Sequence, residues 1–159
     1  MISVERAVRA DVPILAELIG EIEAYYGGTP SDDEYADQIT ALLFGAHPVA
    51  HVLLARAEDR QVLGMASYSF LWPAAGAETS LYLKELFVRP DARKRGVGRA
   101  LMDALGQAAA ETGCSRVEWT ADHDNPAALA FYTALGAQPH NGKIFYRVQA
   151  RRSGFPLTP

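Results

Sequence analysis

The sequence predicts an α/β fold in which a mixed, mostly antiparallel sheet is flanked by helices. Short runs with alternating apolar residues, typical of strands, recur along the chain. Segments with apolar residues at three- and four-residue spacing, typical of amphipathic helices, stand between them. The predicted order is β-α-α-β-β-β-α-β-α-β. Three consecutive central strands favour antiparallel pairing, and a parallel crossover is expected only through the helix that begins at Gly96.

The first third of the chain predicts one strand followed by two helices. Apolar side chains alternate over residues 2–8, as in a strand. Asp11 is placed to cap a first helix that ends near Gly27. Ser31 and Glu34 form the capping-box pattern at the start of a second helix.

The centre of the chain predicts three antiparallel strands, a helix and a further strand. The strands are expected over residues 49–57, 61–72 and 79–89, separated by short polar or Pro/Gly turns. Residues 96–112 have a continuous apolar stripe and predict the crossover helix. Alternation over residues 115–122 predicts the strand that follows it.

The last part of the chain predicts one helix and one strand. Asn125 followed by Pro126 is typical of a helix start, and Gly136 is placed to end that helix. Residues 143–148 predict a final strand.

Length and composition indicate one globular domain. The chain has 159 residues, which fits a single domain over residues 1–150 with a flexible C-terminal tail over residues 151–159. A net charge of −4 makes nucleic acid an unsuitable partner. No apolar run is long enough for a membrane span. One cysteine and no export signal favour a cytoplasmic location, and the histidine spacing predicts no metal.

The strongest chemical signal is a basic turn between a strand-like and a helix-like segment. It consists of Arg93, Lys94, Arg95, Gly96, Val97, Gly98 and Arg99. The first amides of a helix lack partners within the helix, and glycine leaves them accessible to a phosphate. The turn therefore predicts a pyrophosphate site. The alternative is a solvated basic turn that only begins a helix.

These residues resemble the acyl-CoA signature of the GCN5-related N-acetyltransferase (GNAT) family. That signature is Arg or Gln, two residues, Gly, one residue and Gly or Ala, which residues 93–98 match. Residues 85–90 resemble the family's fourth strand, and residues 125–136 resemble its second CoA segment. The resemblance covers nearly the whole chain and implies the GNAT fold, acetyl-CoA as cosubstrate and a homodimer.

The resemblance also implies roles for individual residues. Leu86, Phe87 and Val88 would offer backbone groups to the pantetheine arm and to the developing oxyanion. Asn125 would contact CoA, although a plain helix cap is the alternative. Tyr132 matches the family's general acid, although an aromatic on an amphipathic helix can equally be a core residue.

A closer resemblance is to the diamine (spermidine/spermine) and thialysine acetyltransferase branch. Residues 47–55, 64–72 and 81–83 carry it. Tyr25 and Tyr26 match the acceptor side of that branch, with helix packing as the alternative. The branch has acids where this chain has Lys84 and Tyr26, and the loss of a carboxylate should weaken a polyamine site.

The chemistry expected from the residues agrees with acetyl transfer to an amine. An alkylamine is mostly protonated at neutral pH, so a base or a desolvating site is needed before it can attack a thioester. Glu85 is the candidate base, acting through water; the alternative is a strand carboxylate paired with a nearby cation. The expected function is direct acetyl transfer from acetyl-CoA to a primary amine of a small molecule such as a diamine, polyamine or lysine-like amino acid. The alternatives are a protein or peptide acceptor and a catalytically silent acyl-CoA-binding module.

Overall fold

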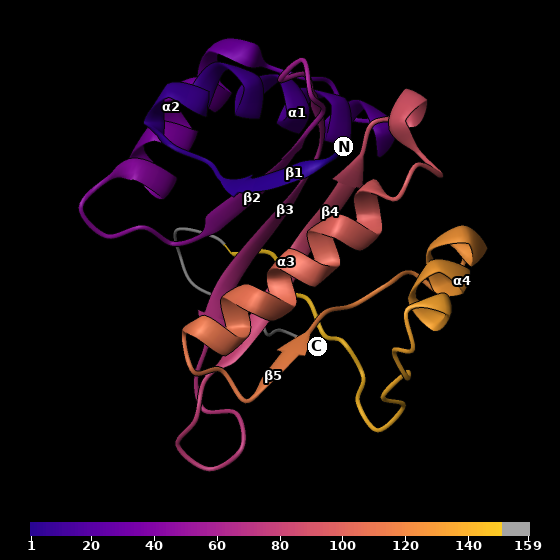
Figure 1. Cartoon of the computed structure of the whole chain (residues 1–159). Helices are drawn as coiled ribbons and strands as arrows, with labels where there is room; N and C mark the ends of the chain where they lie inside the picture. Colours follow the sequence, from indigo (N-terminus) through magenta and orange to yellow (C-terminus); the bar gives the residue numbers. More distant parts are fainter. Residues whose placement is uncertain (151–159) are drawn as a thin grey trace. The chain divides into compact units, whose positions relative to one another are not determined.

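The computed structural model describes residues 1–150, apart from the side chains of Asp32 and Asp33 (Figure 1). The chain divides into two compact units at residue 120, and each unit is described by itself. The single domain over residues 1–150 stays a prediction. The expected tail, residues 151–159, lies outside the described residues.

The first unit is built on a five-stranded sheet in the order β1-β2-β3-β4-β5. The first four strands pair antiparallel, and β5 pairs parallel with β4. The strands are β1 (Ser3–Arg6), β2 (His51–Arg56), β3 (Val62–Leu71), β4 (Ser80–Val88) and β5 (Arg116–Glu118). This arrangement confirms the predicted fold class, including a parallel crossover only through the helix after Gly96.

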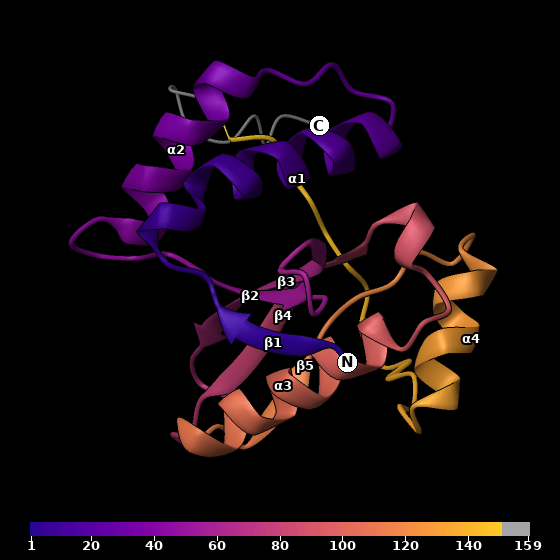
Figure 2. The same cartoon turned by 45° about the horizontal axis from the view of Figure 1, so that its top comes forward.

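Helices cover both faces of this sheet. They are η1 (Arg9–Asp11), α1 (Val12–Tyr25), α2 (Asp32–Phe44), η2 (Pro90–Ala92) and α3 (Val97–Glu111). Figure 2 shows α1 and α2 on one side of the strands and α3 on the other. None of the helices in the described part of the chain is long and apolar enough to cross a membrane.

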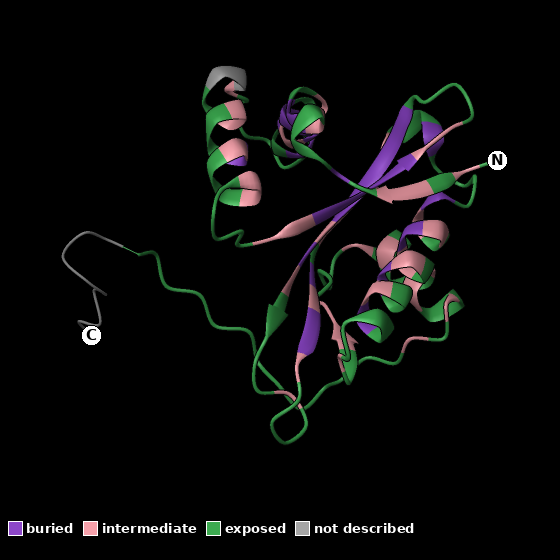
Figure 3. Ribbon diagram, turned by 60° about the vertical axis from the view of Figure 1, so that its left-hand side comes forward, coloured by how far each residue is buried: buried purple, intermediate pink, exposed green. Residues whose placement is uncertain are grey.

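Two apolar clusters fill the space between the sheet and its helices. Leu15 and Leu18 of α1 pack with Leu54 and Met65 of the sheet in one cluster. On the other face, Leu101 of α3 belongs to the second cluster, with Leu53, Ala66 and Leu81 as strand members. Figure 3 shows the same division, with buried segments along the sheet and on the helix faces turned toward it. The alternating apolar residues of the central strands thus supply both cores.

The predicted caps of the first two helices are not formed as expected. Asp11 precedes α1 but makes no side-chain cap bond to it. Instead, the Asp11 carboxylate accepts a hydrogen bond from the Val8 amide (2.8 Å) and pairs with Arg56 (2.7 Å). Ser31 precedes α2, also without a side-chain cap bond. The carboxylate of Asp11 therefore binds Arg56 and the amide at the start of η1, and not the first amides of α1.

The second unit contains α4 (Pro126–Ala134). Asn125 caps it as predicted, because its side-chain oxygen accepts a hydrogen bond from the Ala128 amide (3.2 Å). Gly136 follows the helix with a φ of +87°, a conformation that glycine adopts without strain.

The prediction of a final strand over residues 143–148 is wrong for this structure. No strand is formed there, and the large apolar side chains are exposed, with Ile144 at 77% and Tyr146 at 83%. An alternating sequence forms a strand only where a neighbouring edge accepts its backbone hydrogen bonds. No such pairing is formed within the described residues. The strand before α4 is also shorter than predicted, because β5 ends at Glu118.

Candidate active site

The site is organised by an open edge of β4. This strand pairs with β3 along its whole length, but it pairs with β5 only at Ser80, Leu81 and Tyr82. Beyond Tyr82, that edge of β4 has no strand partner within the described residues. Backbone donors and acceptors on such an edge can bind an extended ligand as another strand would. The open stretch includes the predicted residues Leu86, Phe87 and Val88.

The side chains of these three residues serve the core. Phe87 is buried in the cluster under α1. Leu86 and Val88 pack against the cluster under α3. Because their side chains are used in packing, any contact with a ligand at this edge falls to the backbone, as the resemblance implies.

A β-bulge interrupts β4 beside the open edge. Ser67 of β3 pairs with Glu85, but the next residue, Tyr68, pairs with Leu83, so Lys84 is the additional residue. Leu83 and Leu86 both pack toward α3 although they are three positions apart.

The bulge corrects an expectation about side-chain direction. Strict alternation would place Lys84 and Glu85 on opposite faces. Leu83 faces α3, so its neighbour Lys84 faces away from α3. Leu86 also faces α3, so its neighbour Glu85 faces away from α3 as well. Both side chains are therefore directed to the α1 and α2 side of the sheet.

Gly64 is a site-shaping residue that the sequence analysis missed. It pairs with Val88 at the open end of β4. A Cβ atom at this position would lie 2.5 Å from the carbonyl oxygen of Phe87, closer than real Cβ contacts allow. Any larger residue would therefore displace the β4 backbone. A glycine inside a strand is the sequence signal that marks such a close approach.

The turn before α3 leaves backbone amides exposed at a helix start. Gly96 adopts a φ of +84°, and its carbonyl accepts the first helical bond, from the Ala100 amide (3.0 Å). The amides of Val97, Gly98 and Arg99 precede that bond, so the helix itself offers them no partner. Gly96 supplies no side-chain cap. Partial positive charge at this helix start favours a phosphate.

The basic residues near this turn differ in their availability. Arg89 is 14% exposed at its side chain, and it binds Glu17 (2.6 Å) and Glu21 (2.9 Å) of α1. It therefore holds α1 to the end of β4, and its charge is neutralised there by the two carboxylates. Lys94 and Arg95 are exposed.

Arg93 and Arg99 complete the basic turn. The Arg93 guanidinium donates to the carbonyl of Val88 (3.1 Å) and lies 5.8 Å from the centre of the Tyr25 ring. Arg99 is exposed and makes only a long pair with Asp103 (3.9 Å). Arg93 therefore connects the basic turn to the end of β4 and to α1.

Tyr25 and Tyr26 stand at the end of α1. They are 58% and 62% exposed, and their rings meet edge to face with centroids 5.2 Å apart. Helix packing, the alternative for these residues, therefore leaves most of both side chains exposed. The contact between Tyr25 and Arg93 places this pair of rings beside the basic turn.

The second unit holds the remaining predicted residues. Asn125 is engaged as the cap of α4, and Tyr132 lies seven residues further along, about two helical turns. Tyr132 is partly exposed, with its ring centre 5.2 Å from that of Phe131. The structure thus brings together Glu85, Lys84, the β4 edge and the α3 turn as one set, and Asn125 with Tyr132 as another.

Comparison with known proteins identifies the family. The model of the acetyltransferase (GNAT) family matches residues 15–137. This match spans most of the chain, which therefore belongs to the GNAT acetyltransferase family. Acetyl-CoA is the cosubstrate of this family. Acetyl-CoA is an extended molecule that carries phosphates, and the open β4 edge followed by the α3 amides fits that structure.

Individual relatives support the same family. The chain is 25% identical to thialysine N-epsilon-acetyltransferase of Bos taurus over 86% of its own length and 84% of that protein. It is 32% identical to L-ornithine N5-acetyltransferase NATA1 of Arabidopsis thaliana, over 50% of this chain and 35% of that protein. Among solved structures, the integron cassette protein VCH_CASS6 from the mobile metagenome of V. cholerae has a TM-score of 0.85 and 32% identity, covering 94% and 93% of the two chains.

These relatives confirm the family but not the narrower branch. The thialysine enzyme is a distant relative, and the ornithine enzyme is at least as similar over a shorter stretch. The chain spans about a third of the ornithine enzyme's length. The resemblance to the diamine and thialysine branch therefore does not single out one acceptor.

Proposed function

We propose that this chain transfers an acetyl group from acetyl-CoA directly to a primary amine of a small molecule. The observation that carries the proposal is the continuity of the open β4 edge with the free amides of α3. An extended pantetheine arm would bind along the strand, and the pyrophosphate would bind at the helix start. Glu85 lies on the same strand, where the acyl end of such a ligand would lie.

Two side chains have proposed roles in proton transfer. Glu85 accepts a proton from the attacking ammonium group through water, which makes the amine nucleophilic. Tyr132 donates a proton to the departing thiolate of CoA. Backbone amides of residues 86–88 stabilise the charge that develops on the acetyl oxygen. The amine nitrogen forms a bond to the acetyl carbon as the C–S bond of the thioester breaks. The ammonium form loses two protons overall, one before and one after attack; one is matched by the proton that Tyr132 gives to the thiolate, and the other leaves to solvent through Glu85.

A glycine in the phosphate cradle provides a direct test of the cofactor site. We expect Gly98→Val to weaken acetyl-CoA binding much more than Arg95→Ala, because a branched side chain at the second position of α3 obstructs the approach to the backbone amides. Loss of a single exposed cation removes only a screened attraction. Titration calorimetry of both variants measures the difference. Wild-type affinity in Gly98→Val would show that the amides of α3 do not bind the phosphates.

The acceptor is proposed to be an amino acid with a side-chain amine. The two relatives described above are named for thialysine and L-ornithine, which both carry a carboxylate as well as a reactive amine. In this chain the bulge directs Lys84 and Glu85 to the same side of the sheet, where a cation can meet that carboxylate. Two unit charges about 4 Å apart near a protein surface attract by about 4 kcal/mol before desolvation is counted.

The charge of Lys84 is therefore expected to select the acceptor. Wild-type protein should use lysine-like and thialysine-like amino acids more efficiently than spermine, and Lys84→Glu should shift the preference toward spermine. Values of kcat/KM for spermine, a short diamine and lysine analogues test this expectation. Lys84→Met is the matched control, since it removes the positive charge without adding a negative one. The charge argument would be contradicted by a wild type that prefers spermine and a Lys84→Glu variant with the same preference.

Two other functions compete with this proposal. A protein or peptide acceptor would require the same acetyl-CoA site but a different acceptor side. A silent acyl-CoA-binding module would keep the α3 turn and need neither Glu85 nor Tyr132. The presence of both side chains in the sequence favours an enzyme.

The homodimer implied by the family resemblance stays part of the proposal. Exposed apolar side chains in the second unit support it, since a partner would remove them from water. They are Ile144, Phe145, Tyr146 and Val148. Light scattering on the purified chain should give twice the monomer mass of 17.2 kDa. A monomer mass at micromolar concentration would contradict the dimer and leave the proposed reaction standing.

A further inference from the structure

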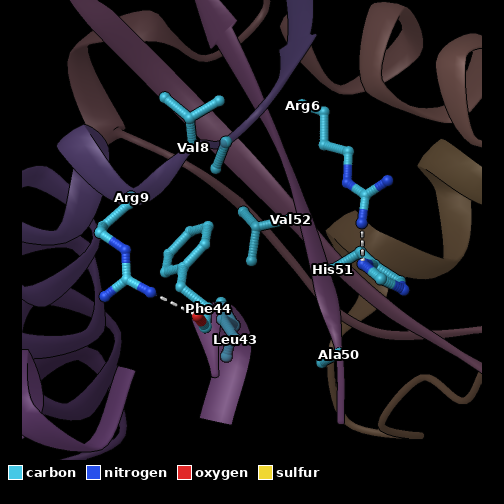
Figure 4. Close-up of a pocket in the computed structure, with 9 residues that line it drawn as sticks. Arg6, Val8, Arg9, Leu43, Phe44, Ala50, His51 and Val52 are labelled. Carbon is cyan, nitrogen blue, oxygen red and sulfur yellow. Dashed lines mark hydrogen bonds between the residues drawn. The ribbon is translucent and has the colours of Figure 1, made fainter. Parts of the chain in front are cut away.

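The helix α1 is fixed to the rest of its unit at its start. Arg9, in the η1 turn directly before α1, donates a hydrogen bond to the backbone carbonyl of Phe44, the last residue of α2 (2.6 Å); Figure 4 shows this contact. Arg56 of β2 pairs with the Asp11 carboxylate (2.7 Å). These contacts hold the first end of α1 against α2 and β2.

The middle of α1 is fixed by Arg89, which directly follows β4. Glu17 and Glu21 stand one helical turn apart, and both bind its guanidinium (2.6 and 2.9 Å). The same guanidinium donates to the carbonyl of Val62 in β3 (3.1 Å). Tyr25 follows one turn after Glu21, so Glu17, Glu21 and Tyr25 form one row on α1. This row faces the segment that leaves β4.

The last turn of α1 lies outside the apolar core. Ile22 is the last buried residue of the helix, and residues 23–28 are all exposed. Tyr25 and Tyr26 belong to this exposed stretch, and their rings meet at 86°. Core packing therefore does not set the position of the two rings, which depends on contacts at the surface.

Arg93 provides such a contact, because its side chain touches both the β4 edge and the tyrosine pair. Its Nε atom donates to the carbonyl of Val88, the last residue of β4 (3.1 Å). Its guanidinium carbon lies over the Tyr25 ring, 5.8 Å from the ring centre. An aromatic ring attracts a guanidinium at this distance. Val88 belongs to the edge proposed for the pantetheine arm, so Arg93 connects that edge to the end of α1.

We propose that Arg93 is a positioning residue, which holds the Tyr25–Tyr26 pair beside the β4 edge so that the rings contact the aliphatic chain of the acceptor. The inference rests on the proposed function, because it assigns the two tyrosines to the acceptor side of that site. Large, partly exposed rings gain free energy when they cover methylene groups such as those of a lysine-like side chain. Arg93 acts through Tyr25 and does not itself touch the acceptor.

The kinetic test is a comparison of two exposed arginines in the same turn. Arg93→Gln should raise the KM for a lysine-like amino acid about five- to tenfold, as expected for the loss of one cation–π contact, with little change in kcat. Arg95→Gln is the matched control. It should weaken acetyl-CoA binding as much as Arg93→Gln does, because both remove one exposed cation from the turn, but it should leave the amine KM unchanged.

A second variant, Tyr25→Leu, tests whether Arg93 acts through the ring. In that background Arg93→Gln should raise the amine KM no further, since the contact is already lost. A further rise of the same size would overturn the proposal. The proposal would also be overturned if Arg93→Gln kept the wild-type amine KM and changed only acetyl-CoA affinity.

NMR of the tyrosine rings gives a readout that does not require turnover. Ring signals, assigned with Tyr25→Phe and Tyr26→Phe, should shift when lysine is added to the full chain saturated with CoA, and Arg93→Gln should need more lysine for the same shift. Rings that do not respond to lysine would overturn the positioning role, whether or not lysine is acetylated. Lysine-dependent shifts without CoA release from acetyl-CoA would instead contradict the acetyl-transfer proposal and leave the positioning role standing.

Discussion

Replacing Glu85 by Gln should lower the turnover number at neutral pH by about 10²- to 10⁴-fold, the usual contribution of a general base. The variant keeps the size and shape of the side chain but loses the ability to accept a proton. The loss should shrink as the pH rises toward the amine pKa of about 10.4, because more of the acceptor is then already neutral. The β4 bulge directs this side chain away from the α3 core, to the α1 and α2 side of the sheet.

A pH–rate profile of kcat and kcat/KM for wild type and Glu85→Gln measures this effect. Glu111→Gln, at the exposed end of α3, is the matched control and should follow the wild-type profile. Profiles of the same shape and height for Glu85→Gln and wild type would make Glu85 a structural carboxylate.

Tyr132→Phe should also reduce turnover by about 10²- to 10⁴-fold, while acetyl-CoA affinity changes little. The substitution keeps the aromatic ring on α4 and removes only the phenolic proton. A residue that serves only in packing would tolerate this change, since the apolar contacts of the ring remain.

Steady-state kinetics together with binding calorimetry separate the two roles of Tyr132. Tyr146→Phe is the control, because it makes the same chemical change at a tyrosine that is 83% exposed in the same unit. An undiminished turnover number in Tyr132→Phe would assign this residue to packing. Weakened acetyl-CoA binding with normal turnover would assign it to cofactor binding.

The central part of the fold could be predicted from the sequence because local signals agree there. The strands β2, β3 and β4 and the helix α3 begin and end within a few residues of the predicted limits. Alternating apolar residues and Pro/Gly turns mark them clearly. The final strand over residues 143–148 could not be decided in this way, because strand formation depends on a distant partner edge that the segment itself does not encode.

The candidate site was predicted in part. The glycine spacing of residues 96–98 located the helix start, since it depends on local backbone conformation. Strict strand alternation gives the wrong face for one of Lys84 and Glu85, because the bulge in β4 arises from its pairing with β3. The ion pairs that neutralise Arg89 join it to α1, more than sixty residues away in the chain. Such tertiary contacts leave no signal in the spacing of neighbouring residues.

The most direct test of the proposed function is release of the CoA thiol from acetyl-CoA with a panel of free amines and peptides. We expect release to depend on the amine, to be fastest with a lysine-like amino acid, and to yield an N-acetylated product of that amine by mass spectrometry. Faster release with peptides would replace the small-molecule acceptor by a protein acceptor. Tight acetyl-CoA binding without amine-dependent release for any member of the panel would contradict the enzyme and support the silent binding module.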